Sequence, residues 1–161
     1  MRRTRQQIPH EEVVEILKRG QTGILAVNGD GGYPYTVPLN YVYKDGKIYF
    51  HCARAGHKFD ALAQDDRVSF CVIDKDDVAP ERLATDYISV VAFGRARLLE
   101  GSELEQAAYE LGIKYYDNPP VVRAEVESTK PRLACFEITV EHMTGKEGIA
   151  LMLSRSHSAK Q

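Results

Sequence analysis

Cationic side chains gather where a short helix is expected to begin, near the middle of the chain. Arg54 comes just before this point, and His57 and Lys58 open the helix-like stretch, ahead of the first acid, Asp60. The first N–H groups of a helix lack partners and carry partial positive charge, so cations are unfavourable there unless an anion is bound. A phosphate would pair with Lys58 and accept a hydrogen bond from His57. The pattern predicts an anion site; the alternative is a solvated loop.

A proline interrupts the strand-like segment that precedes this region. Pro38 stands in the middle of TVPLNYVY (36–43), which is otherwise typical of a strand. Proline cannot donate to a β-ladder, so it marks an edge strand or a bulge. The backbone groups of Leu39, Asn40 and Tyr41 are therefore expected to be free to bind a flat ligand. The alternative is an ordinary edge strand that binds nothing.

A tight turn connects this irregular strand to the strand that leads into the cationic helix start. Asp45-Gly46 is the strongest hairpin signal in the chain. The hairpin is expected to bring Asn40 beside the strand end that carries His51 and Cys52. An anion site and an irregular strand edge would then share one corner, and this combination favours a phosphorylated planar ligand.

The elements that must position this corner are mostly strands. A helix is expected within 8–23, and a second over 102–116, where Ser102 and Glu105 form a capping box. Alternation with a period of two predicts six strands, at 23–29, 33–43, 47–52, 67–73, 86–101 and 132–143. Several turns are too short for parallel crossovers, so the strands are expected to be antiparallel. The predicted fold is mainly β, a small closed or split barrel, because closure removes exposed edges.

A phosphate-binding α/β fold is not expected. The glycine-rich segment VNGDGGY (27–33) lies between two strands and is interpreted as a hairpin turn, whereas phosphate loops open helices. No G-x-G-x-x-G follows the first strand and β–α alternation is not regular, which argues against a Rossmann fold.

The bulk composition is that of one ordinary globular domain, with a core over 8–146 and a tail over 147–161. Of the 161 residues, 43% are hydrophobic and 27% charged, and the net charge of −2 makes nucleic acid an unexpected partner. No apolar region follows the N-terminal MRRTR, and no stretch approaches the roughly 20 apolar residues of a membrane span. A soluble, cytoplasmic protein is expected. Three scattered cysteines without a C-x-x-C argue against a disulfide framework or a zinc ribbon.

The region that carries the candidate corner also carries a family resemblance. GYPYTVPLNYVYKDGKIYFHCARAGHKFDALAQDDRVSF (32–70) resembles the flavin-binding core of the pyridoxamine 5′-phosphate oxidase-like superfamily, and is most similar to its nitroimidazole-resistance (Nim) type branch. The similarity extends over about 8–100, weakens over 101–130 and resumes at FEITVEHMTGK (136–146). It implies a six-stranded antiparallel, Greek-key split barrel that forms a homodimer, with flavin mononucleotide (FMN) at the subunit interface.

The resemblance also implies which residues bind the cofactor. The positions expected to line the isoalloxazine edge, mostly through their backbone, are Pro38, Leu39, Asn40 and Tyr41. The positions expected along the ring, the ribityl chain and the phosphate are His51, Cys52, Ala53, Gly56, His57 and Lys58. A cofactor of the partner subunit would be reached by Ser89 and Val90.

One departure from the family pattern lies at the phosphate. The oxidase has an Arg-Lys pair where this chain has His57-Lys58, so phosphate affinity is expected to be lower and to depend on pH near the histidine pKa. The residues with which the oxidase binds its pyridoxal substrate are not recognisable. Oxidation of vitamin B6 therefore does not follow from the resemblance.

His51 is the candidate catalytic residue, because Nim-type proteins place a histidine at this corner. It could orient a substrate or supply a proton; the alternative is a histidine that is hydrogen-bonded at a dimer interface. A metal site formed by His51, Cys52 and His57 is not predicted, since their spacing places them in a loop rather than on one helix face.

The expected function is that of an FMN-dependent oxidoreductase. A nicotinamide donor would reduce the flavin, which would reduce a small flat acceptor such as a nitroaromatic compound. The alternatives are a non-catalytic flavin-binding module and a haem-binding or haem-degrading split-barrel protein.

Overall fold

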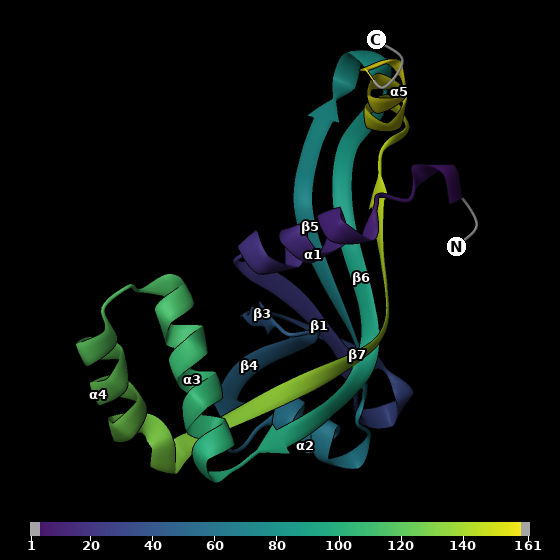
Figure 1. Ribbon diagram of the computed structural model, residues 1–161. Coiled ribbons are helices and arrows are strands. Elements are labelled where there is room, and N and C mark those ends of the chain that lie inside the picture. The colour runs from purple at the N-terminus through teal and green to yellow at the C-terminus, as the bar shows by residue number, and fades with distance from the viewer. Residues whose placement is uncertain (1–3, 159–161) are drawn as a thin grey trace.

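The strands and helices that hold the candidate corner are shown in Figure 1, a computed structural model that describes residues 4–158. The strands are β1 Thr22–Asn28, β2 Pro34–Asn40, β3 Val42–Lys44, β4 Lys47–Ala53, β5 Arg67–Ala79, β6 Ala84–Leu99 and β7 Leu133–Glu147. The α-helices are α1 His10–Arg19, α2 His57–Gln64, α3 Gly101–Tyr115, α4 Pro119–Thr129 and α5 Ile149–Ser158. Short 3-10 turns lie at Thr4–Gln6, Asp30–Gly32, Pro80–Arg82 and Lys130–Arg132.

The strands form one sheet with the order β2-β1-β5-β6-β7-β4-β3, and every pair is antiparallel. The prediction of a mainly β, antiparallel fold is confirmed, but the sheet has seven strands rather than six and is not closed. The expected strand over 33–43 is divided at Tyr41, because β2 pairs with β1 whereas β3 pairs with β4. Since Tyr41 joins strands at opposite edges of the sheet, the two edges must approach each other, and the sheet curls into a split barrel.

The two tight connections predicted from local sequence are confirmed. Asp45 and Gly46 both have positive φ angles, 51° and 78°, and connect β3 to β4 as a hairpin. The glycine-rich segment connects β1 to β2, with a short 3-10 turn at Asp30–Gly32 and no helix after it.

The inside of the curved sheet is filled by apolar side chains. Ile16 and Leu17 of α1 are fully buried, and α1 lies across the long strands in Figure 1. Phe50 of β4 stacks on Phe136 of β7, with 5.4 Å between the ring centroids. Burial of a side chain of this size contributes about 1.5–3 kcal/mol. The strand ends that carry the candidate site are thus fixed by a well-packed core.

A pair of helices, α3 and α4, packs on the outside of β4 and β7. The predicted capping box is wrong: α3 already begins at Gly101, and Glu105 instead forms an ion pair with Lys130. The sequence interpretation missed α4, although Asn118 caps it by accepting a hydrogen bond from the Val121 N–H, and two prolines follow Asn118. A second apolar cluster joins the helices to the sheet: Leu99, Leu104, Ala107, Ala108, Val122, Val126 and Cys135.

The segment described from sequence as a tail, 147–161, contains a helix within its described part. Strand β7 runs as far as Glu147, and α5 follows beside the outer ends of β5 and β6 (Figure 1). Arg155 of α5 forms ion pairs with the buried Glu147 and with Glu12 of α1. These contacts attach the last described helix to the sheet. None of the helices in 4–158 has the length and apolar character needed to cross a membrane.

Candidate functional site

The cationic helix start, at the beginning of α2, has no side-chain cap. Gly56 lies at the N-cap of α2 with a φ of 109°, a conformation that a side chain would strain. Because the helix has no such cap, its first N–H groups are available to an external acceptor.

The two cations at this helix start have different surroundings. The His57 ring packs on Tyr35, with 4.3 Å between the centroids, and its Nδ1 lies 3.6 Å from a carboxylate oxygen of Asp30. Lys58 forms no ion pair with any residue in 4–158; its ammonium lies 6.0 Å from the centroid of the Phe50 ring. The His57 ring thus already has an acid beside it, whereas the Lys58 charge is free for an anion.

The strand that contains Pro38 is an edge strand, as its sequence predicts. β2 stands at one end of the sheet order and pairs only with β1, with Pro38 opposite Ile24. The side chains of Pro38 and Asn40 are exposed, while Leu39 packs against the core. Asn40 Nδ2 donates a hydrogen bond to the Gln21 carbonyl at 3.0 Å, which fixes the end of the strand.

The point where β2 passes into β3 is held by the end of α3, which the sequence interpretation missed. The Tyr41 N–H donates to the Tyr115 hydroxyl at 3.1 Å, and Lys114 Nζ donates to the Tyr41 carbonyl at 2.9 Å and to the Gly20 carbonyl. Lys114 Nζ also lies 4.2 Å from the centroid of the Tyr41 ring. Burial lowers the pKa of Lys114 to about 8. These contacts replace the ladder hydrogen bonds that a strand loses when it changes neighbours.

His51 and Cys52 lie on opposite faces of β4, because side chains alternate along a strand. Cys52 is half-buried against the barrel core, whereas His51 lines a cavity beside α3 and α4, and Ala53 is exposed at the strand end. Desolvation by the surrounding protein lowers the pKa of His51, and the positive charge of Lys58 adds to this effect. Both effects favour the neutral form of the His51 ring.

Ser89 and Val90 lie on β6, away from these residues in the sheet order. Val90 is fully buried and stands between Val72 of β5 and Gly145 of β7, whereas Ser89 is half-buried. The side chain of Val90 belongs to the core, so a contact between Val90 and a cofactor would be limited to its backbone.

A cavity of about 450 Å³ opens beside His51. Its walls come from β2, β4, α3, α4 and the start of β7, and they are mostly apolar. The lining residues are Asn40, His51, Ala108, Leu111, Gly112, Tyr115, Tyr116, Val121, Val122, Glu125, Val126, Thr129 and Leu133. The part of the wall contributed by α4 was missed with the helix itself, whose sequence signal is Asn118 followed by two prolines.

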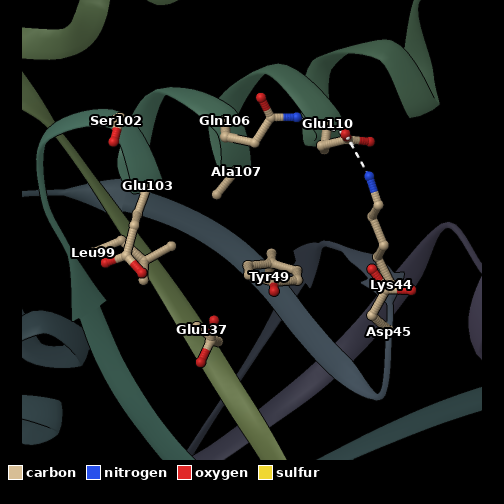
Figure 2. A pocket seen from close by; sticks show the side chains of 10 residues that line it. All are labelled: Lys44, Asp45, Tyr49, Leu99, Ser102, Glu103, Gln106, Ala107, Glu110 and Glu137. Carbon is tan, nitrogen blue, oxygen red and sulfur yellow. Dashed lines mark hydrogen bonds and ion pairs between the residues drawn. The ribbon is translucent and has the colours of Figure 1, made fainter.

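A second hollow, of about 510 Å³, lies between α3 and the β3–β4 hairpin. Figure 2 shows its charged lining, with Lys44 reaching Glu110 across the opening. Glu137 at its base is buried and pairs with Lys47 at 3.0 Å. None of the residues predicted to bind a cofactor lines this hollow.

The curled antiparallel sheet, with a basic helix start beside a free strand edge, defines a split-barrel protein. Comparison with protein families agrees, since the sequence profile described as pyridoxamine 5′-phosphate oxidase matches residues 9–147. The chain therefore belongs to the pyridoxamine 5′-phosphate oxidase family. No curated protein matches the sequence.

Solved structures share the fold over most of the chain. A candidate 5-nitroimidazole antibiotic resistance protein from Bacteroides thetaiotaomicron has a TM-score of 0.72 and 19% identity over 88% of this chain and 86% of its own. A FAD-binding protein from Mesorhizobium loti has a TM-score of 0.64 and 23% identity, covering 88% of this chain and 96% of its own. A FAD and heme binding protein from Mycobacterium smegmatis has a TM-score of 0.76 and 15% identity, covering 89% and 74%. At these identities the likeness establishes the fold alone.

Proposed function

We propose that this protein binds FMN and uses it to reduce a small flat acceptor. One observation carries the proposal: the uncapped start of α2, with the unpaired Lys58, lies next to the strand end that holds His51. This region would therefore bind an anion at the start of α2 and offer a hydrogen-bonding side chain, His51, at the neighbouring end of β4. Family membership and the flavin-binding proteins among the structural neighbours support a flavin as the ligand.

Different residues of the chain would bind different parts of the cofactor. Lys58 and the first N–H groups of α2 would hold the phosphate, with His57 adding a hydrogen bond. The backbone of Pro38–Asn40 would lie along the ring edge, where β2 has no second neighbour. The backbone of Tyr41, the next residue expected at this edge, is already bonded to Tyr115 and Lys114. His51 is the proposed catalytic residue: its neutral ring would donate a hydrogen bond that orients the acceptor, and a proton could come only from its protonated form. When bound, the flavin supplies the electron transfer.

The proposal includes a homodimer, a nicotinamide electron donor and a cytoplasmic location. The outer face of β6 supports the dimer, since Phe93 is 49% exposed and Val91 and Tyr87 on the same face are only half-buried. A second copy would cover these side chains and complete a cofactor groove. The Ser89 face of β6 would then contact the partner's cofactor.

A haem-binding protein is the second candidate, because one structural neighbour is described as binding both FAD and heme. A visible spectrum of the purified protein separates the candidates: flavin absorption supports the proposal, and a Soret band supports haem. Flavin binding without turnover by nicotinamide donors would instead indicate a non-catalytic flavin-binding module.

The decisive experiment is a fluorescence titration of wild type and Lys58→Ala with FMN and with riboflavin. Loss of one charge-assisted hydrogen bond, worth about 1.5–3 kcal/mol, corresponds to a fall in FMN affinity of roughly 10- to 100-fold. Riboflavin lacks the phosphate, so its weaker binding is expected to be unchanged. Equal losses for both ligands would contradict phosphate binding by Lys58. FMN binding that is unaffected by the substitution would leave the helix start as a solvated loop.

A further inference from the structure

The cavity beside His51 has the size and composition of a small-molecule site. Its volume of about 450 Å³ falls within the usual range for ligand pockets, roughly 300–1,000 Å³. Leu111 of α3 and Val122 and Val126 of α4 are buried in its walls, so the cavity is a fixed feature of the helix pair.

A few polar groups converge at the β-sheet end of this apolar cavity. Asn40 and His51 line it there, and the imidazole of His51 has no hydrogen bond or ion pair with any residue in 4–158. A ligand that enters the cavity would meet an unpaired imidazole at one end and aliphatic side chains at the other. This arrangement orients a ring that carries one polar substituent.

The charge of the lining is negative. No lysine or arginine lines the cavity, and the one carboxylate, Glu125, has no ion pair within the described part of the chain. Lys114 lies close in sequence to the lining residues, but its ammonium donates to the carbonyls of Gly20 and Tyr41. The nearest cations lie outside the lining: Lys58 is assigned to the flavin phosphate, and Arg54 Nε donates to the Leu133 carbonyl. An anion among the lining residues would lose hydration without gaining a cation, and would be repelled by Glu125.

We infer that the cavity between α3, α4 and His51 binds the acceptor as an uncharged aromatic molecule and rejects anionic ones. This inference rests on the proposed function, because it assigns an acceptor to the flavin corner. It also predicts that a phosphorylated acceptor binds poorly in the cavity, because no lysine or arginine lines it. The helix pair α3–α4 would then set acceptor specificity.

The charge preference is tested with two isosteric probes, 4-nitrobenzamide and 4-nitrobenzoate, which differ in charge at neutral pH. Calorimetric titration of FMN-loaded protein is expected to show about tenfold or tighter binding of the amide, which corresponds to about 1.4 kcal/mol. Glu125→Gln removes the repelling carboxylate and is expected to reduce this ratio. Equal affinities for the two probes in wild type would overturn the charge assignment.

The position of the bound acceptor is tested with a larger side chain on α4 that fills the cavity. Val121 lines it and is 49% exposed, so Val121→Trp can add a ring there with little effect on the core. Binding of 4-nitrobenzamide is expected to fall about tenfold or more, because the bulky ring takes the ligand's space. The matched control is Ala124→Trp, an exposed α4 position outside the lining, which is expected to leave binding unchanged.

A parallel FMN titration of the same variants distinguishes the two hypotheses. If wild type does not bind FMN, the proposed function fails, while the probe titrations on the flavin-free chain still test the cavity. If Val121→Trp loses FMN and keeps 4-nitrobenzamide, the cavity belongs to the flavin and the inference is wrong. If it keeps FMN and loses only the probe, the inference holds.

Discussion

Two hollows of similar size lie on the two sides of α3, and their linings differ sharply. The charged hollow of Figure 2, about 510 Å³, combines Lys44, Glu103, Glu110 and Glu137 with the apolar groups of Tyr49, Leu99 and Ala107. The cavity beside His51, about 450 Å³, is mostly apolar and contains one carboxylate. The same helix thus presents a charged face to the β3–β4 hairpin and an apolar face to α4.

The volumes of the two hollows do not distinguish a ligand site from a structural one; the pairing of their polar groups does. In the charged hollow the three glutamates have cationic partners within the chain: Glu110 pairs with Lys44, Glu103 with Arg97, and Glu137 with Lys47. These charges are compensated internally and offer little to a ligand. In the smaller cavity the imidazole of His51 has no hydrogen-bond partner among residues 4–158, so a ligand has a partner to gain.

The largest expected effect comes from the buried acid of the charged hollow. Burial alone would raise the pKa of Glu137, but the ion pairs with Lys47 and Arg97 outweigh it and lower the pKa. Glu137→Gln is expected to cost about 1.5–3 kcal/mol of unfolding free energy, less than for a fully buried pair, because both cations are partly exposed. Urea unfolding measures this loss.

The matched control is Glu125→Gln in the apolar cavity. Glu125 is exposed and has no ion pair in 4–158, so its substitution is expected to leave stability unchanged while altering the preference for 4-nitrobenzamide. A Glu137→Gln protein that is stable but has lost acceptor or FMN binding would contradict the division between a structural hollow and a ligand cavity.

A smaller effect is expected at the contact between α3 and Tyr41, where Lys114 makes the free energy of unfolding depend on pH. The folded protein lowers the pKa of Lys114 from 10.5 to about 8, so the unfolded chain binds more protons between these values. The contribution of Lys114 to stability is thus least favourable below pH 8 and becomes more favourable as pH rises toward 10.5. The tyrosines that face it, Tyr41 and Tyr115, have raised pKa values and titrate above most of this window.

The measurement is urea unfolding of wild type and Lys114→Met at a series of pH values from 7 to 10. Wild type is expected to gain stability relative to the variant as pH rises. A difference that stays constant across the series, or that moves in the opposite direction, would show that Lys114 is not desolvated at this contact.

Local signals explain what the sequence could predict. The turn at Asp45-Gly46 depends on residues that tolerate positive φ, and Pro38 marks an edge because it lacks an N–H. Both features are read from adjacent residues, and the structure confirms both. The helix start at His57 was predicted from the same kind of signal. Whether these residues bind a phosphate stays a prediction.

Contacts between distant segments explain what could not be predicted. The strand over 33–43 is divided because its two halves pair with different neighbours, which depends on the closing of the whole sheet. The hydrogen bond from Lys114 to the Tyr41 carbonyl joins residues 73 positions apart, and Asp30 and His57 are also distant in sequence. Helix α4 was the exception, since Asn118 followed by two prolines is a local start signal that was overlooked.

The smallest effect is expected at the outer ion pair of the charged hollow, between Lys44 and Glu110. The atoms are 2.7 Å apart, but the side chains are 48% and 29% exposed, so water and salt compete with the contact. Lys44→Met is expected to leave unfolding nearly unchanged at low salt and wholly unchanged at high salt, where the wild-type pair is screened. FMN and 4-nitrobenzamide titrations should match wild type. If this substitution instead weakens either ligand as strongly as a change inside the apolar cavity, the charged side of α3 takes part in binding, and the contrast between its two faces is lost.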